Sequence, residues 1–140
     1  MRTMSLDVGT RTIGIAVSDL LGMIANGVET IHRTSEERDY ARIAQLIKEH
    51  EVDTLVVGYP KNMNGTIGER AQACEAMAAK LRKMFPAVKV VLWDERLSTV
   101  AAEKVLVDAD MRRKKRKKVI DMMAAVVILQ NYLDSKSFKI

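Results

Sequence analysis

The stretch TMSLDVGTRTIGIAVSD, residues 3–19, decides the fold class. Apolar residues alternate with small or polar ones on both sides of the short segment GTRT; these apolar residues are Met4, Leu6, Val8, Ile13, Ile15 and Val17. A period of two is typical of strands with one buried face. Two such strands joined by a few turn residues predict an antiparallel hairpin. Asp7 falls on the polar side of the first strand, opposite the small residues Gly14 and Ala16, which leave room for a ligand.

The remaining elements follow from the same reading of hydrophobic period and turn residues. Further strands are predicted over residues 27–32, 53–60 and 88–93, and helices over residues 35–51, 69–84, 94–106 and 119–133. Ser35 is the expected N-cap of the first helix. The order is β-β-β-α-β-α-β-α-α over a single domain of residues 1–140. It predicts an α/β fold with a mixed central sheet, in which an antiparallel meander joins parallel strands and helices cover both faces.

The positive charge is local. The net charge is +5 from 23 basic and 18 acidic residues, but seven of the basic residues lie in residues 112–118. The other 16 basic residues face 18 acids, so the remainder of the chain is near −2. A concentrated patch favours an anionic partner such as a nucleic acid.

Composition also excludes several classes. Cys74 is the only cysteine, so an intrachain disulfide or a cysteine-rich zinc site is not possible. Asp7 comes too early for a signal peptide, and the uncharged apolar run 122–129 is too short for a bilayer. We therefore expect a cytoplasmic protein with no membrane association.

Acidic residues stand in unusual places. Asp7 lies within a strand, Asp94 and Glu95 end a buried strand, and Asp121 is the only charge in an apolar helix. Each has a structural explanation of its own, as a turn former, an exposed corner or an ion-pair partner. Together they can converge at one sheet edge, where carboxylates suit Mg²⁺ or Mn²⁺. Two such ions about 4 Å apart support phosphodiester hydrolysis.

Four collinear motifs carry a resemblance. LDVGTRTIGIAVSD, LVVGYPKNMNGTIGERA, WDERLST and KKVIDMMAAVVILQNYL together resemble the YqgF (RuvX) family of Holliday junction resolvases and pre-16S rRNA nucleases. The resemblance spans nearly the whole chain and implies an RNase H-like fold. It implies a metal-dependent nuclease, a hydrolase acting on ester bonds, whose catalytic and metal-binding triad is Asp7, Glu95 and Asp121. Asp94 is the fallback for Glu95, and two Mg²⁺ or Mn²⁺ ions are expected.

Other motif residues suit substrate handling. Nucleic-acid contacts are expected at Thr10, Arg96, Ser98, Arg112, Arg113, Lys114, Lys115, Arg116, Lys117 and Lys118. The last seven, residues 112–118, are called the basic run here; we expect it to be a phosphate-binding loop beside Asp121. Asp19 matches the family but is expected to cap a turn. Cys74 and Trp93 are expected in the core.

Two functions from other classes compete with the nuclease. DVGTRTIG also resembles the first phosphate motif of the actin, Hsp70 and sugar-kinase ATPases, but a second phosphate motif is missing from the sequence. A non-catalytic binder could use the basic run alone. Between nuclease substrates, precursor rRNA is favoured over branched DNA, because junction resolution needs a two-fold dimer and the sequence shows no extra dimerisation segment. A monomer or a homodimer is expected.

Overall fold

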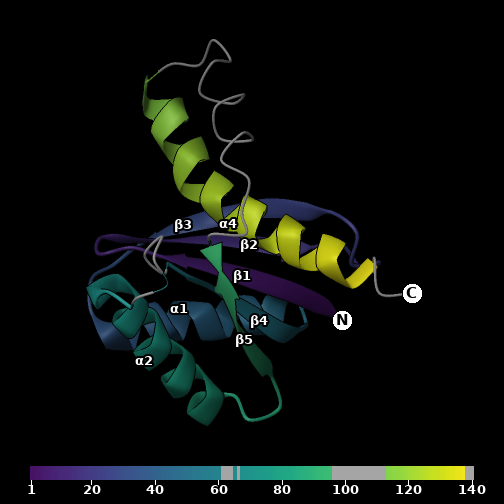
Figure 1. Ribbon diagram of the computed structural model, residues 1–140, viewed down its shortest axis with the longest axis horizontal. Helices are drawn as coiled ribbons and strands as arrows, with labels where there is room; N and C mark the ends of the chain where they lie inside the picture. Colours follow the sequence, from purple (N-terminus) through teal and green to yellow (C-terminus); the bar gives the residue numbers. More distant parts are fainter. Residues whose placement is uncertain (61–64, 66, 96–112, 138–140) are drawn as a thin grey trace.

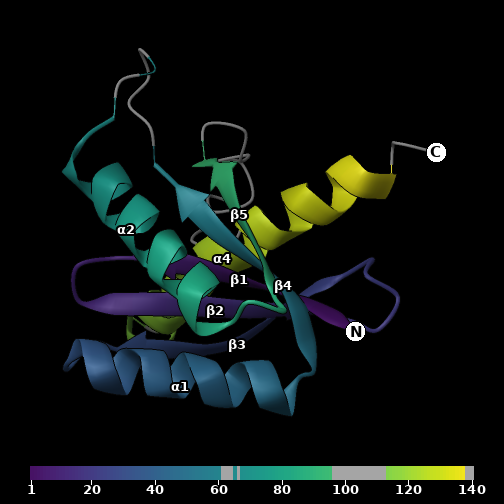
Figure 2. The same cartoon turned by 90° about the horizontal axis from the view of Figure 1, so that it is seen from below.

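The computed structural model describes residues 1–60, 65, 67–95 and 113–137, and the side chains of residues 113–121 and 137 lie outside that description. A five-stranded sheet forms the middle layer, in the order β3-β2-β1-β4-β5. Helices α1 and α2 cover one face and α4 covers the other (Figures 1 and 2). The elements are β1 (Arg2–Val8), β2 (Thr12–Ser18), β3 (Ala25–His32), α1 (Glu36–Glu49), β4 (Val52–Tyr59), α2 (Glu69–Met84), β5 (Lys89–Asp94) and α4 (Arg113–Ser137).

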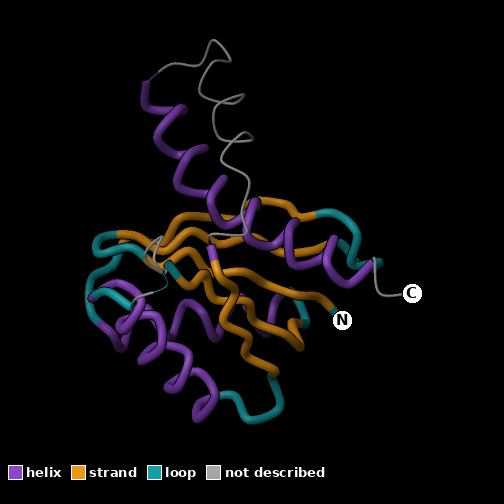
Figure 3. Tube along the Cα trace, viewed as in Figure 1, coloured by secondary structure: helices purple, strands orange, loops and turns teal. Residues whose placement is uncertain are grey.

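The meander predicted from residues 3–19 and 27–32 is confirmed. β1 pairs antiparallel with β2, and β2 pairs antiparallel with β3. Asp7 stands opposite Gly14, as the alternation predicts. β4 and β5 then add to the other side of β1 in parallel, so the sheet is mixed. As a result β1, β4 and β5 run in the same direction, and their carboxyl ends lie at one edge of the sheet. The strands form one layer between helices (Figure 3).

Alternation along β1 separates two cores. Met4, Leu6 and Val8 point into a cluster with α1 and α2. The residues between them point towards α4, where a second cluster includes Ala16, Val56, Ala125 and Ile128. Apolar groups on both faces explain why residues 55–59, LVVGY, form a continuous apolar run within the strand predicted over residues 53–60.

The first two helices follow the prediction closely. The Ser35 hydroxyl caps α1 by accepting a hydrogen bond from Arg38 N at 3.3 Å. Helix α2 has the predicted bounds. Of the helix predicted over residues 94–106, only Asp94 and Glu95 are described; Asp94 ends β5 and Glu95 follows it.

The last helix begins earlier than predicted. Helix α4 begins at Arg113 and not at residue 119, so residues 113–118 of the basic run are helical and do not form a loop. Lysine and arginine are good helix formers, and no Gly or Pro interrupts residues 113–137. The apolar period that was used to place the helix starts only after the charges, which is why the prediction began too late. No described helix is both long enough and apolar enough to cross a membrane.

Candidate active site

Asp7 lies on the side of the sheet that faces α4. It shares this side with Ser5, two residues earlier, whose hydroxyl donates to the carbonyl oxygen of Ala125 at 2.6 Å. Asp7 is partly exposed, whereas Ser5 is fully buried. The hydrogen bond fixes α4 against the middle of β1, and Asp7 lies two residues further along β1, towards its carboxyl end.

Glu95 reaches the same side of the sheet from the end of β5. A Cβ atom built on Gly58 of β4 would lie 3.2 Å from both Cδ and Oε1 of Glu95. The carboxylate of Glu95 therefore lies directly on the backbone of Gly58. Because Leu6 pairs with Val57, the next residues, Asp7 and Gly58, are neighbours on adjacent strands. Only the absence of a side chain at residue 58 allows the Glu95 carboxylate to come so near to the strand of Asp7.

Asp94 belongs to the opposite side. Trp93, one residue earlier, packs in the α4 cluster, so alternation directs Asp94 towards α1 and α2. There its charge acts on Tyr59, whose hydroxyl donates to a carboxylate oxygen of Glu75. That hydrogen bond, followed by burial and the nearby carboxylates, raises the pKa of Tyr59 to about 12. The two adjacent acids thus diverge to opposite faces of the sheet.

Cys74 is affected by both carboxylates. Its thiol is 1% exposed on α2, which confirms the predicted core position. Burial raises the pKa of Cys74 to about 11, and the negative charges of Glu95 and Asp7 act in the same direction.

The backbone of α4 places Asp121 on a stripe of residues that contacts the sheet. Ala125, Ile128 and Tyr132, at helical spacing, meet Ser5, Gly58 and Trp93 respectively. Asp121 occupies the next position of this stripe, one turn towards the N-terminus of the helix. Its side chain is not described. Among the side chains that are described, no group of three or more His, Cys, Asp or Glu residues could hold a metal ion.

The turn after β1 is held by two arginines that the sequence analysis did not single out. Arg33 Nη1 donates to the carbonyl oxygen of Gly9 at 2.8 Å, and Arg70 Nη2 donates to that of Val8 at 3.3 Å. Gly9 N also donates to Thr12 O at 2.8 Å within the turn. The sequence contained an indication for Arg70, because a cation in the first turn of a predicted helix is unfavourable with the helix dipole and therefore suggests another role. Arg33 had none.

The other predicted contacts are placed unevenly. Thr10 is exposed in the turn between β1 and β2. Residues 114–118 occupy the start of α4 with Arg113, without described side chains. Arg96, Ser98 and Arg112 lie outside the described residues.

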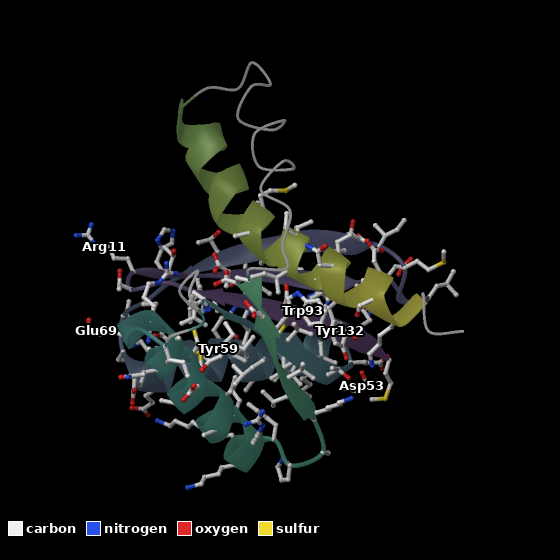
Figure 4. All side chains as sticks on the ribbon, in the orientation of Figure 1. Arg11, Asp53, Tyr59, Glu69, Trp93 and Tyr132 are labelled. Carbon is white, nitrogen blue, oxygen red and sulfur yellow. The ribbon has the colours of Figure 1, made fainter. Side chains whose placement is uncertain are left out.

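Two further expectations concern residues away from this edge. Asp19 caps its turn, as predicted, by accepting hydrogen bonds from Met23 N at 2.8 Å and Ile24 N at 3.2 Å. These bonds hold the pKa of Asp19 below its usual value. Trp93 packs edge to face on Tyr132 with ring centroids 5.6 Å apart (Figure 4). It is partly buried within the α4 cluster, in keeping with a core position.

Comparison with known proteins identifies the family. A family model described as "RuvX: Holliday junction resolvase" matches residues 1–135. The chain belongs to the RuvX family. It is 62% identical over 138 residues to a Geobacillus kaustophilus protein named "Putative pre-16S rRNA nuclease", covering 97% of this chain and 99% of the relative. It is 57% identical to a protein of the same name from Halalkalibacterium halodurans, over 99% of this chain and 100% of the relative.

Solved structures with the same fold include two Holliday junction enzymes. Thermus thermophilus RuvC superposes with a TM-score of 0.65 at 12% identity, covering 99% of this chain and 97% of RuvC. The Fowlpox virus resolvase in complex with Holliday junction DNA gives a TM-score of 0.60 at 12% identity, covering 97% and 99%. At such identities the likeness shows the fold alone. It confirms the RNase H-like fold.

Proposed function

We propose that the protein is a metal-dependent endonuclease that hydrolyses phosphodiester bonds in structured RNA, and that it matures the 5′ end of precursor 16S rRNA in the cytoplasm. One observation carries the proposal. The Glu95 carboxylate lies on Gly58, next to the strand of Asp7 and on the α4 side of the sheet. This supports a site shared by two carboxylates, one in β1 and one directly after β5, with a third, Asp121, whose backbone lies one helical turn from the contact between α4 and β1.

These residues suit a hard divalent cation. Carboxylate oxygens are preferred by Mg²⁺ and Mn²⁺, and the missing side chain at Gly58 leaves space for the Glu95 carboxylate. Asp7, Glu95 and Asp121 would hold the ions, two in number by analogy with other phosphodiester hydrolases. Bound divalent cations lower the pKa of a water and stabilise the leaving oxygen. Asp94 would be a poorer ligand, because alternation along β5 directs it to the face of the sheet opposite Trp93.

The chain's other residues would bind and orient the substrate. Thr10 lies three residues after Asp7, in the turn between β1 and β2, and it presents a hydroxyl and a backbone N–H there. Arg96, Ser98 and the basic run would hold backbone phosphates near the cut. Their positive charge would also offset the repulsion between the carboxylate cluster and the polyanion. The ion pairs formed with phosphate would make binding depend strongly on salt.

RNA is the preferred substrate because the relatives that are about 60% identical carry the name of a pre-16S rRNA nuclease. The second candidate is junction resolution, supported by the description of the family model. That reaction requires a homodimer with two-fold symmetry, whereas rRNA maturation is compatible with a monomer. A binder without catalysis is the remaining alternative.

The test compares wild type with Asp7→Asn in Mn²⁺ on precursor 16S rRNA and on synthetic four-way junctions. We expect wild type to shorten the rRNA precursor. Asp7→Asn should cut about 10³-fold more slowly, a loss that corresponds to several kcal/mol of transition-state stabilisation, while still binding the RNA. Asp19→Asn is the matched control, because Asp19 is an aspartate that caps a turn away from this edge.

The outcomes are distinct. Cleavage of junctions but not of rRNA would replace the preferred substrate with the second candidate. RNA binding without cleavage by wild type, in either Mg²⁺ or Mn²⁺, would favour the binder. Equal cleavage by wild type and Asp7→Asn would remove Asp7 from the site.

A further inference from the structure

The two carbonyl groups that follow Asp7 are both bound by arginines from outside the hairpin. Arg70 comes from the first turn of α2 and contacts Val8 O. Arg33 directly follows β3 and contacts Gly9 O, while its own backbone N–H donates to Arg11 O at 2.8 Å. The turn is therefore attached to the rest of the fold at the point where the chain leaves Asp7.

Arg33 is itself fixed by a buried acid. Its Nε atom lies 3.3 Å from Oδ2 of Asp39, whose side chain is only 4% exposed. Oδ1 of Asp39 accepts a hydrogen bond from Thr34 N at 3.3 Å. Asp39 is the one acidic residue that is buried among the residues whose burial is described. A buried carboxylate is costly unless it is paired, so the pair holds the guanidinium in one orientation.

This orientation determines where the next N–H points. In a trans peptide the C=O and the N–H point in opposite directions. Because Gly9 O is directed to Arg33, the N–H of Thr10 in the same peptide is directed away from it. Thr10 is exposed. A backbone N–H held in a fixed direction beside a carboxylate site can bind a phosphate oxygen without reorganising first.

We propose that the Asp39–Arg33 pair is a positioning device that orients the Gly9–Thr10 peptide, so that the N–H of Thr10 is presented to the scissile or an adjacent phosphate. This inference rests on the proposed nuclease function. Arg33 and Asp39 act through the turn and are positioning residues. They help to explain how a turn with a glycine can hold a fixed geometry beside Asp7.

The decisive variant is Arg33→Lys. A lysine keeps the charge, but its single ammonium cannot reach Asp39 and Gly9 O with separate donors in a fixed plane. The matched control is Arg42→Lys. Arg42 also joins α1 to β3 through a two-pronged pair, with Nη2 at 2.6 Å and Nε at 3.0 Å from the Glu29 carboxylate, but it has no bond to the turn. Arg33→Lys loses the arginine pair with Asp39, and Arg42→Lys loses the arginine pairs with Glu29 and Glu49.

We expect Arg33→Lys to lower kcat by about 10- to 100-fold, because misplacement by about 1 Å has effects of that size. KM should change less. Arg42→Lys should keep kcat within about 2-fold of wild type. Because Asp39 is buried and Glu29 is partly exposed, Arg33→Lys should lower the unfolding temperature more than Arg42→Lys does, so cleavage is measured at a temperature at which both variants are fully folded. Asp39→Asn, which leaves an acceptor for Thr34 N, should likewise lower kcat more than it changes KM. A kcat loss in Arg33→Lys no larger than in Arg42→Lys would overturn the inference.

A second measurement is independent of nuclease activity. The amide NMR signals of Gly9 and Thr10 in the protein without RNA should shift in Arg33→Lys and not in Arg42→Lys. Unchanged signals in Arg33→Lys would refute the positioning, whatever the cleavage assay gives. If wild type cuts no substrate, the proposed function fails, and the amide signals still decide whether Arg33 orients the peptide.

Discussion

The substitution Gly58→Ala tests how the candidate site is built. A methyl group at this position would lie 2.7 Å from Cδ1 of Ile128 and 3.2 Å from Cδ and Oε1 of Glu95. Ile128 belongs to α4, is 1% exposed and packs against β4, so its Cδ1 cannot move into solvent. One added methyl group therefore presses on the core and on the carboxylate at the same time.

The two effects have separate magnitudes. Overpacking a close-packed core by one methyl group costs about 1–3 kcal/mol, which for a chain of this length lowers the unfolding temperature by roughly 3–12 °C. A displacement of Glu95 by a few tenths of an ångström up to about 1 Å should lower the cleavage rate by about 10- to 100-fold. The loss of activity should therefore exceed what partial unfolding explains at 25 °C.

The double variant Gly58→Ala/Ile128→Val separates these effects. Valine lacks Cδ1, so it removes the 2.7 Å contact and leaves the contact with Glu95. Ile128→Val alone should cost about 0.5–1.5 kcal/mol. In the Gly58→Ala background, Ile128→Val should lower the free energy of unfolding by less than that, or raise it. The cleavage activity of the double variant should stay low. Thermal unfolding and cleavage in Mn²⁺ are measured for all four proteins. Wild-type stability in Gly58→Ala, or full recovery of cleavage in the double variant, would refute the proposed placement of Glu95.

Three further predictions use other described contacts. Ser5→Ala removes the buried hydrogen bond to Ala125 O and should lower the free energy of unfolding by about 1–2 kcal/mol in urea denaturation; no loss would show that α4 does not depend on it. The hydrogen bond from Arg42 holds the pKa of Glu29 below its usual value, so this partly exposed pair should contribute about 0.2–1 kcal/mol above pH 4.5 and lose it as the pH falls. The stability gap between wild type and Glu29→Gln should thus narrow from pH 6 to pH 3, and a constant gap would contradict this. Replacing residues 115–117 with glutamine should reduce the slope of log K against log[salt] for RNA by about 2–3, with little change in the Mn²⁺ dependence of cleavage; an unchanged slope would exclude the basic run from phosphate binding.

Local patterns were enough to predict most of the fold. The strands of the meander follow from alternation around GTRT, and Ser35 and the bounds of α2 follow from capping and hydrophobic period. The start of α4 was missed because apolar period marks only the part of a helix that packs on a core. Residues 113–118 are helical through propensity and continuity, which a run of like charges conceals.

The candidate site was predictable only in part. Asp7 and Asp121 stand out as acids within apolar segments, Asp94 and Glu95 stand out as a pair at the end of a buried strand, and the family resemblance names Asp7, Glu95 and Asp121. The choice between Asp94 and Glu95 could not be made from spacing. It depends on which of the two residues at the end of β5 lies on the side of the sheet that α4 covers. Arg33 and Asp39 carried no signal, since an arginine after a strand and an acid in the first turn of a helix are both ordinary.

The sequence by itself predicted most of the elements, their order and the candidate acids Asp7, Asp94 or Glu95, and Asp121, because period, capping and turn chemistry act between residues a few positions apart. Only the tertiary structure decided that Glu95 rests on Gly58 under Ile128, and that Arg33 reaches Gly9. These contacts join residues 24 to 70 positions apart in the printed sequence. They depend on the register of β1 with β4 and on where α4 crosses the sheet. Register and crossing are set by the packing of whole elements, so no local pattern could have contained them.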